Sequence, residues 1–83
     1  MSYYLLMCRS LTYAQRTARI LERFGITAIV TRAPQSMSAE GCAYCVKISE
    51  NKLSDSLRVL KNSGAPPVRI FLSQGQQLRE VPV

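Results

Sequence analysis

Two cysteines stand where a polar stretch of this chain gives way to an apolar one. The segment reads Gly41-Cys42-Ala43-Tyr44-Cys45, and a third cysteine, Cys8, lies near the start of the chain. A thiolate is a good nucleophile and metal ligand, so these thiols are the groups that could do chemistry. The sequence contains no histidine, which excludes Cys–His and Ser–His catalysis.

The spacing of Cys42 and Cys45 favours neither a metal site nor a thioredoxin-type redox site. A structural zinc site takes about four thiolate or imidazole ligands, and the chain offers 3 cysteines and no histidine. A thioredoxin motif begins a helix, whereas this spacing enters a strand, where alternation would send the two sulfurs to opposite faces. We therefore expect no metal and no other cofactor.

The composition is that of one small basic domain. The chain has 83 residues, 47% of them hydrophobic, and its 11 Lys+Arg against 5 Asp+Glu give a net charge of +6. This charge favours anionic partners, although it also serves solubility. The N-terminal residues lack the pattern of a signal peptide, and no apolar run approaches the roughly 20 residues that span a bilayer. We expect a cytoplasmic protein without membrane contact, whose cysteines stay reduced.

Apolar periodicity divides most of the chain into two similar halves. The first half predicts a strand over 3–8, a helix that Ser10 or Thr12 caps and Gly25 ends, and a strand over 26–31. A polar segment that reads as a loop follows, up to residue 41.

The second half repeats this order. It predicts a strand over 42–48, a helix that Ser49 or Asn51 caps and Gly64 ends, and a strand over 68–72 after two prolines. Residues from Ser73 to the end, which hold three glutamines and one glycine, read as a loosely ordered tail.

The resulting order of elements predicts an α+β domain of the ferredoxin-like type over residues 1–72. Right-handed crossovers would turn strand-helix-strand-strand-helix-strand into a four-stranded antiparallel sheet with both helices on one face. The expected order of the strands in that sheet is 4-1-3-2.

This topology would gather the candidate residues at one end of the sheet. The start of the third strand, with Cys42, would lie beside the end of the first strand, with Cys8. Amide groups at the start of the first helix and a nearby guanidinium would lower the pKa of a thiol there, which favours a reactive Cys42. The residues expected to support it, as further thiols or as groups that stabilise an anion, are Cys8, Arg9, Ser10, Arg32, Ser38, Gly41 and Cys45. The alternative is that Cys42 is an inert, partly buried strand residue.

Most of the chain, roughly residues 3–72, resembles the Se/S carrier protein-like family. The resemblance rests on an opening strand with a Ser/Thr-led helix, on the Gly25-Ile26 turn, and on the segment 34–47. That segment combines a proline, small residues, a Gly-Cys element and a basic residue that ends the strand. The resemblance implies that Cys42 is the cysteine that holds sulfur or selenium.

The resemblance therefore implies that the protein carries sulfur or selenium and does not itself catalyse a reaction. Cys42 would accept sulfane sulfur or selenium from a donor enzyme and hand it to an acceptor enzyme. The protein would need an exposed thiol and no acid–base groups of its own, because its partner enzymes would supply the catalysis.

Two alternatives stay open. Arg16, Arg19 and Arg23 recur at helical spacing, as they would in a nucleic-acid-binding module of the RRM type. However, such a row is typical of a solvated helix face, and the third strand lacks the aromatic residues of RNA-binding sheets. The other alternative is a regulatory ACT-like or structural module. That module would form a homodimer that buries an open sheet face, which does not conflict with a carrier function, and the apolar residues of that face are Ile29, Cys45 and Phe71.

Overall fold

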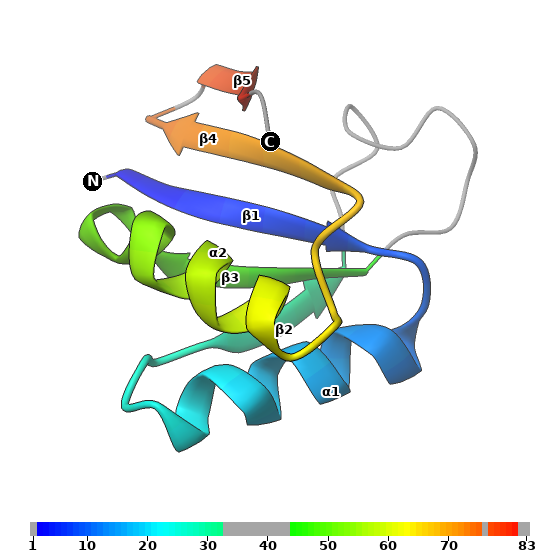
Figure 1. Cartoon of the computed structure of the whole chain (residues 1–83). Helices are drawn as coiled ribbons and strands as arrows, with labels where there is room; N and C mark the ends of the chain where they lie inside the picture. The colour runs from blue at the N-terminus through cyan, green and yellow to red at the C-terminus, as the bar shows by residue number, and fades with distance from the viewer. Residues whose placement is uncertain (1, 33–43, 76, 82–83) are drawn as a thin grey trace.

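The computed structural model describes residues 2–32, 44–75 and 77–81. In these residues the strands form one sheet, and two α-helices cover one of its faces (Figure 1). The elements follow one another as β1 (Ser2–Cys8), α1 (Leu11–Arg23), β2 (Ile29–Arg32), β3 (Tyr44–Ser49), the 3-10 turn η1 (Glu50–Lys52), α2 (Leu53–Asn62), β4 (Arg69–Gln74) and β5 (Gln77–Val81). None of the helices in the described ranges is long and apolar enough to cross a membrane.

The prediction of a four-stranded ferredoxin-like sheet was wrong. Across the described residues the sheet has five strands in the order β2-β3-β1-β4-β5, and neighbouring strands are antiparallel. The difference arises after Ser73, where we expected a loose tail. Ser73 and Gln74 instead complete β4, Gly75 turns the chain with a φ of 58°, and β5 returns beside β4.

An ion pair ties β5 to its neighbour. The Arg69 guanidinium donates from Nε and from an Nη to the two carboxylate oxygens of Glu80, at 2.9 and 2.6 Å. Two parallel charge-assisted bonds of this kind fix the mutual orientation of the strands. The hydrogen bonds from Arg69 hold the pKa of the Glu80 carboxyl below its usual range. The chain from Gln77 to Val81 is therefore a paired edge strand.

Capping residues set the limits of α1. Ser10 is its N-cap, and the Ser10 hydroxyl accepts a hydrogen bond from the Tyr13 amide at 3.3 Å. At the other end Gly25 adopts a φ of 78°, and the Ile26 amide donates to the Leu21 carbonyl at 3.0 Å. These bonds satisfy carbonyls that the end of a helix leaves free. The predicted cap at Ser10 and stop at Gly25 are confirmed.

The second helix ends as predicted but begins later. Gly64 follows α2 with a φ of 72°, and the Ala65 amide donates to the Leu60 carbonyl at 2.9 Å. At the start, Ser49 precedes the turn η1 and makes no side-chain capping bond, and Lys52 is the N-cap of α2. The sequence pattern did not separate this short 3-10 turn from the helix.

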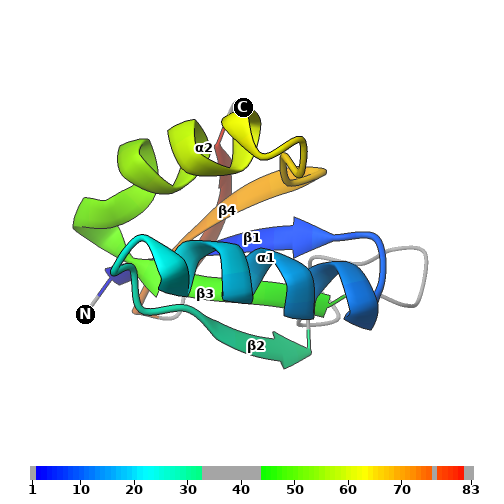
Figure 2. The same ribbon diagram turned by 60° about the horizontal axis from the view of Figure 1, so that its bottom comes forward.

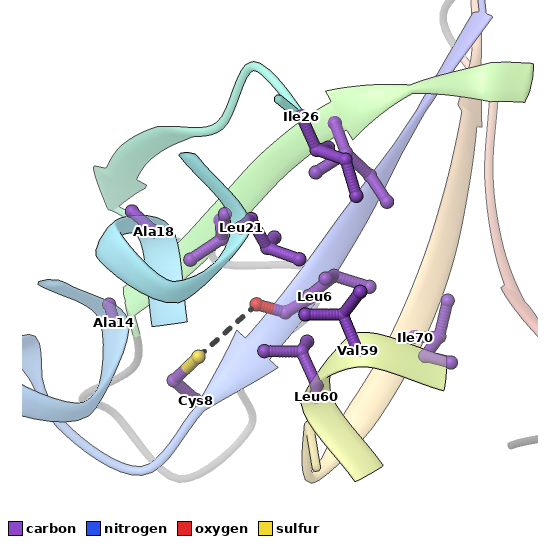
Figure 3. Packing of buried hydrophobic residues seen from close by; sticks show 11 residues of the cluster. Leu6, Cys8, Ala14, Ala18, Leu21, Ile26, Val59, Leu60 and Ile70 are labelled. Atoms are coloured by element: carbon purple, nitrogen blue, oxygen red, sulfur yellow. Dashed lines mark hydrogen bonds between the residues drawn. The ribbon is translucent and has the colours of Figure 1, made fainter. Parts of the chain in front are cut away.

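The main core lies between the helices and the sheet (Figure 3). Each helix turns one stripe of side chains toward the sheet, at the spacing that places residues on one face. The buried residues of α1 are Ala14, Thr17, Ala18 and Leu21, and those of α2 are Ser56, Val59 and Leu60. The strands contribute Leu6, Val46, Ile48 and Ile70, all nearly or fully buried. This packing holds α1 against β1, β2 and β3.

The opposite face of the sheet carries a second buried cluster. Its members are Leu5, Met7, Cys45 and Phe71. At its edge the Lys47 ammonium lies 4.2 Å from the centre of the Tyr3 ring, a cation–π contact. We expected Cys45, Phe71 and Ile29 to form an open apolar face, but the first two are buried within the single chain and Ile29 is exposed. The surface available for sheet-to-sheet pairing is smaller than expected, and homodimer formation stays a prediction.

Candidate functional site

Several predicted site residues lie at one end of the sheet, where neighbouring strands begin or end. Cys8 ends β1, its partner across the ladder on β3 is Tyr44, and the partner of Tyr44 on β2 is Arg32. Two inter-strand spacings, roughly 10 Å, separate the backbones of Cys8 and Arg32. Arg9 and Ser10 follow Cys8 directly and lead into α1. We call this end of the sheet the rim, and its residues are Cys8, Arg9, Ser10, Arg32 and Tyr44.

Some of the predicted site residues lie outside the described residues. These are Ser38, Gly41 and Cys42. In the sequence Cys42 precedes Tyr44 by two residues, and Tyr44 is the first residue of β3. The part of the site that the structure describes therefore consists of the rim and Cys45.

Cys8 lies beneath α1 with its thiol inside the protein. Its side chain is 6% exposed. The sulfur lies 3.6 Å from the Leu6 carbonyl oxygen (Figure 3) and 3.8 Å from the Thr17 hydroxyl oxygen, so the S–H group can donate to either. Burial raises the pKa of the Cys8 thiol, and the hydrogen bond with Thr17 offsets part of that rise. Cys8 is therefore a neutral thiol at pH 7, even though the N-terminus of α1 lies just beyond it.

Cys45 lies on the other face of the sheet and does not join the rim. Its ladder partners are Met7 and Thr31, and its side chain is 0% exposed in the second cluster. Burial raises the pKa of Cys45 to about 11, and the charge that Cys8 would carry adds to the rise. The sheet separates the two thiols, so a disulfide between Cys8 and Cys45 would require the backbone to move.

The described residues do not offer a metal site. Across 2–32, 44–75 and 77–81, no group of three or more Cys, Asp or Glu side chains could hold an ion. The Cys42-x-x-Cys45 spacing does lead into a strand, with Cys45 on the face away from the helices. The arrangement suits the chemistry of single thiols.

A hollow of about 430 Å³ opens beside Cys8. We call it the thiol pocket, and its lining residues are Cys8, Arg9, Tyr13, Thr17, Gly64, Ala65, Pro66, Pro67 and Val68. The loop after α2 is held against the end of β1 because the Val68 amide donates to the Met7 carbonyl at 2.9 Å. The hollow lies within the size range of small-ligand sites. It combines a thiol, a hydroxyl and a guanidinium with an apolar wall.

Sequence reasoning missed Thr17 and the wall of the thiol pocket. Thr17 is a polar residue in the apolar stripe of α1, three positions after Ala14, and this is the signal that could have singled it out. Pro66 and Pro67 were interpreted only as a break before the last predicted strand. Because proline fixes φ, they also give that loop a stiff backbone beside the thiol.

Because of the buried thiols, we expect the free energy of unfolding to vary with pH in the alkaline range. A cysteine in the unfolded chain ionises near pH 8.5, whereas folded Cys45 keeps its proton up to about pH 11. Between these values the folded state binds more protons than the unfolded state, so the free energy of unfolding falls as pH rises. We expect the urea midpoint to fall between about pH 8.5 and about pH 10.5, and we expect Cys45→Ala to flatten this fall.

The comparison of slopes separates Cys45 from other groups that titrate in this range. Cys45→Ala also leaves a small cavity, which lowers stability at every pH and does not alter the slope. Cys8, whose pKa is raised as well, contributes in the same direction in both proteins. Parallel pH profiles for the wild type and Cys45→Ala would contradict the raised pKa.

Comparison with known families gives one match. A family model with the description "Putative Se/S carrier protein-like" matches residues 3–72, which confirms the resemblance seen in the sequence. The searches of curated proteins and of solved structures each gave no match. The matched residues include the whole rim and end within β4, before β5. Because the match spans most of the 83 residues, the chain belongs to the family described as "Putative Se/S carrier protein-like".

Proposed function

We propose that this protein carries sulfur or selenium on Cys42, between a donor enzyme that loads it and an acceptor enzyme that unloads it. The family description supports the kind of cargo. The observation that carries the proposal is the pairing of Tyr44, two residues after Cys42, with Cys8 beside the thiol pocket. This pairing holds Tyr44 at the rim, where the N-terminus of α1, Arg9 and Arg32 also lie.

The other two cysteines are poorly suited to hold the cargo. Cys8 and Cys45 are buried, and burial raises the pKa of both thiols. The thiolate is the attacking species, so neither is a good nucleophile at pH 7. In this proposal the attack falls to Cys42. The groups that favour its anionic form are Arg9, Ser10 and Arg32 at the rim, with Ser38 and Gly41 as further donors.

Loading is a thiol exchange that conserves electrons. The Cys42 thiolate attacks the outer sulfur of a cysteine persulfide on the donor, the S–S bond of the donor breaks, and the donor cysteine leaves as a thiolate. A new S–S bond on Cys42 now holds the transferred sulfur: Cys42 is oxidised to a persulfide while the donor persulfide is reduced to a thiolate, so the exchange needs no external oxidant. Selenium in place of the outer sulfur follows the same path. The partner enzymes supply the catalysis, so the protein acts as their substrate.

Loading is measured by intact mass. After incubation with a cysteine desulfurase and cysteine, we expect a mass increase of about 32 Da, one sulfur atom, that a reductant removes. Cys42→Ser should abolish the increase, whereas Cys8→Ala should retain it. A wild-type protein that gains no mass, or a Cys42→Ser variant that still gains it, would refute the proposal.

A further inference from the structure

The surface of α1 carries a second hollow, rich in guanidinium groups. Its volume is about 530 Å³, and it lies between α1 and the end of α2. We call it the arginine groove, and the lining residues that matter here are Thr12, Arg16, Arg19, Ile20, Arg23 and Ser63. The three arginines are exposed. Their spacing of three and four residues sets them about 4.5 and 6 Å apart along the helix axis.

The positive charge of this groove is not neutralised within the described part of the chain. No acidic side chain lines it there. The ion pairs recorded among the described residues use Arg58 and Arg69, and none of the three groove arginines. The protein as a whole has a net charge of +6. A row of unneutralised guanidinium groups in a hollow is suited to carboxylates or phosphates, which arginine binds in pairs of parallel hydrogen bonds.

The arginine groove and the thiol pocket lie along the same helix, and α1 begins directly after Ser10 of the rim. Thr12 and Ser63 line the groove, and their neighbours in sequence, Tyr13 and Gly64, line the thiol pocket. Figure 2 shows α1 and α2 running alongside each other over the same face of the sheet. A segment bound along the arginine groove would therefore lead toward the rim.

We propose that the arginine groove docks an acidic helix of the donor enzyme and so brings the reactive cysteine of that enzyme to the rim. This inference rests on the proposed carrier function. A helix with carboxylates three and four residues apart would match the spacing of Arg16, Arg19 and Arg23. Ile20 adds an apolar side chain to the lining beside the arginines, a combination typical of protein interfaces. The positive field would also speed the encounter with an acidic partner.

The structure favours a protein partner over RNA. RNA-binding sheets offer exposed aromatic rings on which bases stack. Here the sheet face away from the helices is filled by a buried cluster that includes Leu5, Cys45 and Phe71. The Tyr3 ring on that face is occupied by the Lys47 ammonium. The arginine groove lies on the other side of the sheet, over the helices, and none of the described residues that line it is aromatic.

Binding is tested with a labelled helical peptide that carries glutamates three and four residues apart, by fluorescence polarisation at low salt. A peptide with glutamine at the same positions and a single-stranded RNA are the comparison probes. The variant is Arg16→Glu with Arg19→Glu, and the matched control is Lys52→Glu with Arg79→Glu. All four positions are exposed, and both double variants lower the net charge equally.

We expect the groove variant to weaken binding of the acidic peptide at least about tenfold and the control variant less than about threefold. The glutamine peptide should bind neither the wild type nor the two variants. Equal losses in the two variants, no binding to the wild type, or tighter binding of RNA with the same dependence on the groove would each overturn the inference. The measurement involves no sulfur transfer. A failure here with a normal gain of mass in the loading experiment would therefore reject the docking site and leave the carrier function standing.

Discussion

Cys45 in the folded protein is expected to react with iodoacetamide at pH 8 at least about 100-fold more slowly than an ordinary thiol. Its pKa is raised to about 11, so about one molecule in a thousand holds the thiolate at pH 8, against roughly a quarter for a thiol of pKa near 8.5. The side chain is also 0% exposed. Access to the reagent would require the sheet to open locally, which slows the reaction further.

The rates are measured for each cysteine by quenching at intervals and mapping the modified peptides. In guanidinium chloride we expect all three cysteines to react at similar rates, which is the control for the reagent. Cys8 should also be slow in the folded protein, because burial raises its pKa and leaves its side chain 6% exposed. Folded-state modification of Cys45 at a rate near that of the unfolded chain would contradict the buried position.

Leu6→Ala is expected to lower the free energy of unfolding by about 3 kcal/mol. Leu6 is 0% exposed at the centre of β1, between Val46 on β3 and Ile70 on β4. Its side chain faces Leu60 and the other helix residues of the main core (Figure 3). The substitution removes buried methyl groups and leaves a cavity that strands paired on both sides cannot close. A domain of this size has a total stability of about 5–15 kcal/mol, so the loss is large.

Leu11→Ala is the matched control. Leu11 begins α1 and is 41% exposed, so the same chemical change should cost less than about 1 kcal/mol. Chemical denaturation of both variants gives the comparison, with equal slopes required for the midpoints to be compared. Equal destabilisation by the two variants would mean that the core does not lie between β1 and the helices.

Periodicity was a good guide to the elements that bury a regular stripe and a poor guide to the last strand. The stripe of α1 and the glycine stops at Gly25 and Gly64 are visible in the sequence because they obey local rules. In β5 only Leu78 and Val81 are apolar, and most of the strand is exposed. Its formation depends on pairing with β4 and on the Arg69–Glu80 pair, which bring together residues that no local pattern connects. Gly75 between two short polar runs was the available signal for a hairpin.

The backbone placement of Cys8 at the rim was predictable from the sequence, and the electrostatics of its thiol were not. Antiparallel pairing of the first and third strands follows from the order of elements, and it sets Cys8 beside Tyr44. Alternation along β3 also separates Cys45 from Tyr44 correctly. The sequence suggested that a helix N-terminus would lower the pKa of a thiol at the rim. For Cys8 burial outweighs that effect, because Cys8 packs beneath the helix that follows it.

The position of β1 in the sheet has a consequence for synthesis on the ribosome. β1 leaves the ribosome before the other strands, yet it pairs with β3 on one side and β4 on the other. The edge that pairs with β3 must wait until residue 49 has been translated, and the edge that pairs with β4 must wait until residue 74. Until then the nascent chain exposes an unpaired strand with apolar side chains. Folding of the domain depends on contacts between residues that are distant in the sequence, and such contacts form slowly. We therefore expect chaperones to bind the β1 segment until its partner strands have been translated.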